Sequence, residues 1–257
     1  MNQPNTSPSS APPVEPRKPP TIPLTRPRWV FIFLTINITL WVLMTLAGGS
    51  QNGLVLTQFG ANIAPLIAMG EVWRLLTANF LHIGVVHLAF NTYALYLLGQ
   101  EGEALFGSPR FVLIYLLSGL SGSILSFIVR TDVVLSAGAS TSIFGLMGAL
   151  TAFFVRNRQQ FGDVGRRRLN NYIFFALLNL WIGFTVPGID NLGHIGGYLG
   201  GLALGWMLCP FYRVEFEGRE QRVTDLNSLR NEWFGVGLFA ALLVVATIAG
   251  IARWSAF

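Results

Sequence analysis

The segment SAGASTSIFGLMGA, residues 136–149, places polar and very small residues at the head of an apolar run. Ser140 lies there, two residues after Gly138 and directly before the hydroxyl residues Thr141 and Ser142. A serine at this position can be plain packing, with its hydroxyl bonded to its own helix. It becomes a candidate nucleophile only if a general base reaches it and water is present.

The composition predicts a membrane protein. Of the 257 residues, 52% are hydrophobic and 11% are charged, against about 25% charged residues in soluble domains. At about 20 residues per membrane helix, the chain has room for about six or seven spans. The single cysteine, Cys209, excludes an internal disulfide. We expect no cleavable signal peptide, because the first 27 residues contain no apolar core segment.

We predict an all-α, polytopic membrane protein with a six-helix core and an added seventh transmembrane helix. The expected spans are residues 29–47, 80–98, 111–129, 140–154, 172–186, 192–208 and 233–251. The expected organisation is a disordered Pro/Ser-rich cytoplasmic tail (1–27), a membrane core (28–210), a cytoplasmic linker (211–231) and the seventh helix (232–257). Residues 48–80 carry apolar pieces too short to cross, which predicts a partly submerged loop.

The distribution of charge predicts the orientation. In this arrangement all of the 17 Lys and Arg residues except Arg74, Arg130 and Arg253 fall on the side of the N-terminus. The largest cluster is Arg166–Arg168. Positive charge stays inside, so we expect a cytoplasmic N-terminus and an external C-terminus. We expect the plasma membrane of a bacterium, because the sequence shows no clear organelle signal. A nucleic-acid role for the cluster is disfavoured, because topology already accounts for its charge.

Three of the expected spans, 80–98, 140–154 and 192–208, then run from outside to inside. All three histidines of the chain, His82, His87 and His194, lie with Ser140 near the start of these spans or just before it. Polar residues at this depth mark a site or a hydrated cavity by default. The orientation therefore brings four chemically active side chains to one level of the membrane.

His194 is the candidate general base, since a neutral imidazole is the usual partner of a nucleophilic hydroxyl. It lies one turn before Gly197, and Gly201 and Gly205 follow on the same helix face. Such a ridge lets another helix approach closely, and the span that begins at Ser140 offers small residues at Gly145, Gly148 and Ala152. We expect these two spans to touch, which would bring His194 to Ser140.

The expected site is a Ser-His dyad, because no acidic residue inside a span is placed to orient His194. Phe144, one turn beyond Ser140, is a candidate to stack on the imidazole. Asp190, in the loop four residues before His194, is not assigned the role of orienting the imidazole.

Oxyanion donors are expected from His87 and Asn91, which lie one turn apart on one helix face. The backbone N–H of Ser140, at a helix start, is a third candidate. The His87–Asn91 pair could equally be a structural hydrogen bond between helices. For His82 we favour a solvated or supporting histidine. Trp73 and Arg74 are most simply an interfacial anchor.

Together these motifs resemble the rhomboid family of intramembrane serine proteases over roughly residues 28–210. The matching elements are Gly138-Ala139-Ser140, His194 with Gly197 and Gly201, His87 with Asn91, the pair Trp73-Arg74, and the run Gly99, Glu103, Gly107. The resemblance implies a serine endopeptidase that cleaves transmembrane helices of membrane-protein substrates near the outer face, with neither metal nor cofactor. It implies Ser140 as nucleophile, His194 as base, and His87 and Asn91 as contributors to the oxyanion hole.

The chain departs from the family pattern at two positions. Thr141 stands where Gly is frequent, and Phe144 stands where many members have Tyr. Neither change removes a catalytic group, although a phenolic hydrogen bond is lost at residue 144.

Other classes of function stay open. One is a catalytically silent relative that binds membrane helices. Another is a transporter, or a haem or metal protein that uses the three histidines. A zinc protease is disfavoured, because the chain has no HExxH motif. The sequence predicts no nucleic-acid partner and does not define the oligomeric state.

Overall fold

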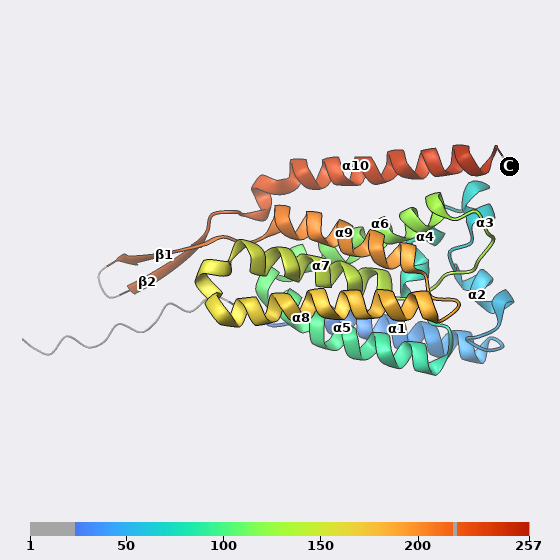
Figure 1. Ribbon diagram of the computed structural model, residues 1–257, viewed down its shortest axis with the longest axis horizontal. Coiled ribbons are helices and arrows are strands. Elements are labelled where there is room, and N and C mark those ends of the chain that lie inside the picture. Colours follow the sequence, from blue (N-terminus) through green and yellow to red (C-terminus); the bar gives the residue numbers. More distant parts are fainter. Residues whose placement is uncertain (1–23, 218–219, 257) are drawn as a thin grey trace, which may run out of the picture.

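The computed structural model describes residues 24–217 and 220–256 and is a bundle of long helices (Figure 1). The long helices are α1 (Trp29–Leu46), α5 (Gly84–Phe106), α6 (Ser108–Val129), α7 (Ser140–Arg156), α8 (Arg158–Thr185), α9 (Asn191–Leu208) and α10 (Leu229–Trp254). Most of the tail predicted at residues 1–27 lies outside the described residues. The architecture confirms the all-α membrane fold.

Short helices fill the connection between α1 and α5. They are α2 (Gly53–Phe59), α3 (Ala64–Ala68), α4 (Arg74–Thr77) and the 3-10 helix η1 (Ala78–Phe80). None is long enough to cross a bilayer, which needs about 20 residues. The connection is therefore a folded loop, and it lies at one end of the bundle (Figure 1).

Length and apolar composition pick out three of the described helices as membrane spans on their own: α1, α6 and α10. The pair formed by Arg74–Phe80 and α5 would be a fourth, bent by 89°. The predicted span from residue 80 thus begins later, at Gly84, whose φ of +77° belongs to the left-handed region that glycine tolerates. Helix α7 is apolar but shorter than these spans.

Two segments differ from the sequence-based expectation. Arg166–Arg168 lie within α8, which begins at Arg158 and has a non-helical Gly162, and do not form a loop. Arg and Gln are good helix formers, so the helix continues beyond its apolar part. The predicted linker contains an antiparallel hairpin of β1 (Tyr212–Glu217) and β2 (Glu220–Asp225).

Helix α9 packs against α7 and α6 along its glycines. A Cβ atom added at Gly201 would lie 1.9 Å from the carbonyl oxygen of Gly145, and one at Gly197 would lie 2.1 Å from that of Thr141. On the other side, Ser121 Oγ of α6 donates to the carbonyl of Gly196 at 3.0 Å. Only residues without a side chain permit such close approach. This packing places the first turns of α7 and α9 side by side.

Helix α10 lies along the outside of the bundle, and its C-terminal end reaches the end that carries α2 and α3 (Figure 1). There Trp254 Nε1 donates to the carbonyl of Phe127 at 2.9 Å, and Arg253 Nη1 donates to that of Ile128 at 2.8 Å. The hairpin lies at the opposite end (Figure 1), where Arg110 and Asp225 form an ion pair at 2.6 Å. The bundle thus has a loop end and a hairpin end.

Candidate active site

The candidate nucleophile and base meet at the loop end of the bundle. Ser140 is the first residue of α7, and His194 lies in the first turn of α9. His194 Nε2 and Ser140 Oγ are 2.9 Å apart, within hydrogen-bond distance. His194 is 7% exposed. An imidazole nitrogen at this distance is placed to take the proton of the hydroxyl.

The imidazole is held by an aromatic ring. The ring of Phe144 stacks on that of His194 with centroids 4.2 Å apart and planes 9° apart. Within the described part of the chain, His194 Nδ1 has no hydrogen-bond partner. Stacking on Phe144, and not a carboxylate on Nδ1, therefore fixes the plane of the ring.

His87 and Ser140 flank the same glycine. A Cβ atom at Gly138 would lie 2.9 Å from His87 Nε2 and 3.5 Å from Ser140 Oγ. The φ of Gly138 is +151°, so a side chain there would be both strained and obstructed. His87 Nδ1 accepts the N–H of Ile83 at 3.3 Å, so in the neutral ring Nε2 carries the proton. His87 therefore directs an N–H donor toward the space beside Ser140.

Asn91 lies one turn below His87 and is buried. Its Nδ2 donates to the carbonyl of His87 at 2.9 Å, within the same helix. One N–H of the Asn91 side chain is therefore used in a hydrogen bond within α5 and not in a bond to another helix. A carboxamide has two N–H donors, so this bond leaves the second N–H of Asn91 available.

His82 is fully buried, which excludes the solvated alternative and leaves the supporting one. Its Nε2 faces the backbone N–H of Ala139 at 3.5 Å, one residue before Ser140, and its ring neighbours that of His87. His82 thus supports the backbone that presents Ser140. Among residues 24–217 and 220–256, no group of three or more His, Cys, Asp or Glu is arranged to hold a metal ion.

Arg74 is buried and organises the loop between α1 and α5. Its Nη1 donates to the carbonyl of Thr57 at 2.7 Å and to that of Ala61 at 3.2 Å. Its guanidinium also lies over the ring of Trp73, which is about half exposed. Arg74 therefore braces the loop from inside, while Trp73 faces outward.

The sequence analysis assigned no contacts to two residues near the site, Asn79 and Asp190. Asn79 accepts the hydroxyl proton of Thr141 and donates to Ser123 Oγ at 3.1 Å. Asp190 caps α9, with Gly193 N–H donating to its Oδ1 at 3.0 Å. The second was recognisable, because Asp is a preferred N-cap residue; the first was not, because its partners are distant in sequence.

The arrangement agrees with the comparison to known families. The Rhomboid domain model matches residues 69–211, which is more than half of the chain. The chain belongs to the rhomboid family. The match contains every residue of the proposed rhomboid site, from Trp73 and Arg74 through Ser140 to His194.

Several curated relatives carry the family name. Rhomboid protease GluP of Bacillus subtilis (strain 168) is 46% identical over 177 residues, which cover 68% of this chain and 34% of that protein. Rhomboid-like protease 1 of Toxoplasma gondii is 35% identical over 187 residues, which cover 70% of this chain and 60% of that protein. RHOMBOID-like protein 7 of Arabidopsis thaliana is 39% identical over 154 residues, which cover 60% and 48%. The chain spans less than two thirds of the length of each.

Proposed function

We propose that this rhomboid is an intramembrane serine endopeptidase that cleaves transmembrane segments of membrane-protein substrates near the outer face. The observation that carries the proposal is the 2.9 Å contact between His194 Nε2 and Ser140 Oγ across two helices. The similarity to proteins named rhomboid proteases supports the same reaction class.

The contact between Ser140 and His194 supports the following reaction. Ser140 Oγ attacks the scissile carbonyl carbon while His194 Nε2 takes the hydroxyl proton. His194 then gives that proton to the leaving amine, and water hydrolyses the acyl-enzyme with the same histidine as base. Phe144 keeps the imidazole plane fixed during both proton transfers, since its ring is stacked on that of His194.

When Ser140 attacks, the carbonyl oxygen of the substrate becomes an oxyanion, which needs hydrogen-bond donors. Helix α7 begins at Ser140, so the N–H of this residue belongs to the first turn, which has no intrahelical acceptor. His87 Nε2 adds a second donor beside Gly138, and the Asn91 amide is a third candidate. A single donor of this kind contributes about 2.7–4 kcal/mol to transition-state stabilisation.

The substrate helix enters between α5 and α8. The polar contacts between these helices lie toward the hairpin end, where Tyr172 donates to Glu101 at 2.6 Å and Arg168 pairs with it at 3.2 Å. Toward the loop end, α5 and α8 expose large apolar side chains, including Phe90 and Phe184. The substrate must unwind at its top, because helical carbonyls are already hydrogen-bonded. The α8–α9 connection, with Pro187 and Gly188, is the candidate cap.

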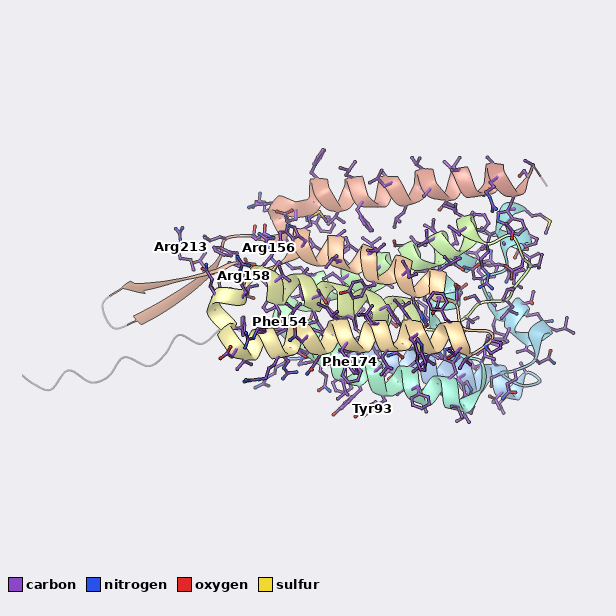
Figure 2. The ribbon with its side chains drawn as sticks, in the orientation of Figure 1. Tyr93, Phe154, Arg156, Arg158, Phe174 and Arg213 are labelled. Atoms are coloured by element: carbon purple, nitrogen blue, oxygen red, sulfur yellow. The ribbon has the colours of Figure 1, made fainter. Side chains whose placement is uncertain are left out.

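The proposed orientation has the hairpin end in the cytoplasm of a bacterium and the loop end outside. Figure 2 shows Arg156, Arg158 and Arg213 gathered at the hairpin end. Cationic residues concentrate on the cytoplasmic side of membrane proteins. Ser140 then lies toward the external face, where water reaches the acyl-enzyme.

The test is cleavage of a single-span substrate by the purified protein in liposomes. We expect Ser140→Ala and His194→Ala each to lower kcat by at least about 10³-fold, because the two groups act as a unit. Ser142→Ala, which removes a buried hydroxyl two residues further along α7, is the matched control and should retain activity. A fluorophosphonate probe should label Ser140 in the unaltered protein. Unchanged cleavage by either dyad variant would refute the proposal, and absence of labelling would favour a silent binder of membrane helices.

A further inference from the structure

The carboxylate of Asp190 gathers contacts from three parts of the fold. Ser126 Oγ of α6 and Ser136 Oγ of the loop before α7 both donate to Oδ2, at 2.7 and 2.8 Å. Gly193 N–H donates to Oδ1 at 3.0 Å, and Arg130 Nη1 lies 3.6 Å from the same oxygen. The side chain is 11% exposed. Hydrogen bonds to a carboxylate are stronger than those between neutral groups.

Asp190 and Ser136 each lie four residues before one member of the dyad. Asp190 lies four residues before His194, whose N–H donates to the Asp190 carbonyl at 3.0 Å. Ser136 lies four residues before Ser140. One carboxylate therefore connects the backbone leading to the base with the backbone leading to the nucleophile.

Ser136 is also fixed from its other side. It pairs with Asn62 in an antiparallel bridge, with N–O distances of 2.9 and 3.0 Å, and Gly138 N–H donates to the carbonyl of Ala78 at 2.9 Å. The segment before Ser140 is thus attached to the α1–α5 loop by its backbone and to the start of α9 through Asp190.

The glycine contacts between α7 and α9 do not by themselves fix the position of one helix along the other, so such an attachment is needed. Gly197 and Gly201 touch backbone atoms of α7, and these contacts bring the helices close without interlocking side chains. Transfer of a proton between Ser140 and His194 depends on their separation to within a fraction of an ångström, since misplacement by about 1 Å can cost 10²-fold in rate. Polar contacts at the helix starts are suited to fix that register.

We propose that Asp190 is a positioning residue of the dyad, which holds Ser140 and His194 in reacting register through Ser136 and the start of α9. The proposal rests on the proposed function. A purely structural role is the competing explanation, because Asp190 is also the N-cap of α9. The two roles differ at Oδ2: the cap needs only the bond from Gly193 to Oδ1, whereas the positioning role also needs the bond from Ser136 to Oδ2.

Ser136 and Ser126 offer a matched pair of variants. Each donates one hydrogen bond to the same oxygen atom, but Ser136 leads to the nucleophile and Ser126 lies within α6. Ser136→Ala and Ser126→Ala therefore remove the same kind of bond. Asp190→Asn adds a variant in which the Oδ1 acceptor for the cap is kept and Oδ2 is replaced by a donor.

The experiment measures kcat, KM and the thermal unfolding midpoint of the full chain in liposomes, with the single-span substrate. We expect Ser136→Ala and Asp190→Asn to lower kcat about 10- to 100-fold, with KM within about twofold of the unaltered protein. Ser126→Ala should lower kcat by less than about threefold at a similar shift of the midpoint. Combined with Asp190→Ala, Ser136→Ala should cause no further loss, because both remove one interaction.

Equal losses of kcat in Ser136→Ala and Ser126→Ala, in proportion to their midpoints, would reduce Asp190 to a structural cap and overturn the proposal. The serine pair decides the matter even if variants of Asp190 do not fold. Failure of the unaltered protein to cleave, or cleavage that survives Ser140→Ala, would refute the proposed function, and the positioning role would fall with it.

Discussion

At the scale of single residues, the site depends on how one imidazole is held. In a Ser-His-Asp triad a carboxylate on Nδ1 fixes the tautomer and plane of the ring. Here the plane is set by Phe144, whose ring lies 9° from parallel to that of His194. The stacking replaces one function of the missing acid, namely orientation, but supplies no charge.

Replacement of Phe144 tests this assignment. Phe144→Ala removes the stacked ring, and aromatic pairs are worth about 0.5–1.5 kcal/mol beyond their buried area. We expect kcat for the single-span substrate to fall about two- to tenfold, with little change in KM, because Phe144 is buried and contacts the base. Phe144→Tyr keeps the ring and should stay near the unaltered rate. Equal rates for Phe144→Ala and Phe144→Tyr would show that stacking does not orient the base.

Ser140, His194 and the stacking ring of Phe144 could be predicted from the sequence, whereas the loop contacts that support them could not. Ser140 and His194 stand out because polar groups are rare in apolar helices and because family motifs surround them. Asn79, His82 and Ser136 lie in or beside loops, where polar residues are ordinary, and their partners come from distant parts of the chain. No periodicity marks such contacts, so the structure was needed to find them.

At the scale of elements, small residues set how α7 and α9 meet. The spacing of Gly197, Gly201 and Gly205 predicted a close helix contact, and each would place an added Cβ within 2.4 Å of an α7 backbone atom. The start of α5 and the β1–β2 hairpin were harder to predict from the sequence. The bend before Gly84 depends on a positive φ. Polar and apolar residues alternate in the first strand of the hairpin, Tyr212–Glu217, but the second strand, Glu220–Asp225, carries only one apolar residue, Val223.

A pair of glycine variants tests the contact. A Cβ at Gly201 would lie 1.9 Å from the carbonyl oxygen of Gly145, whereas nothing lies within 4 Å of a Cβ at Gly237 in α10. Gly201→Ala should therefore destabilise the fold by about 1–3 kcal/mol, as overpacking does, and lower kcat by separating the dyad. Gly237→Ala should be neutral or stabilise by about 0.5–1 kcal/mol, because Ala favours the helix. Denaturation monitored by circular dichroism measures both, and equal stability of the two variants would contradict close packing.

At the scale of the whole molecule, the two ends of the bundle have different chemistry. The loop end carries the dyad, the short helices α2 to α4 and the C-terminus of α10 (Figure 1). The hairpin end carries Arg156, Arg158 and Arg213 (Figure 2). In the proposed function and orientation, this separation would supply water for deacylation at one membrane face and cationic residues for orientation at the other.

The proposed orientation predicts which positions react with a membrane-impermeant maleimide in intact bacterial cells. Cys209 is the one cysteine of the chain and is buried, so a Cys209→Ser background gives a clean start for single cysteines. Ser255→Cys, at the end of α10, should be labelled in intact cells, because the loop end faces outward. Gln159→Cys, an exposed position near the start of α8, should be labelled only after permeabilisation, because the cationic hairpin end stays inside. The reverse labelling pattern would show that the protein has the opposite orientation. The dyad would then lie on the cytoplasmic side, which would contradict cleavage near the outer face.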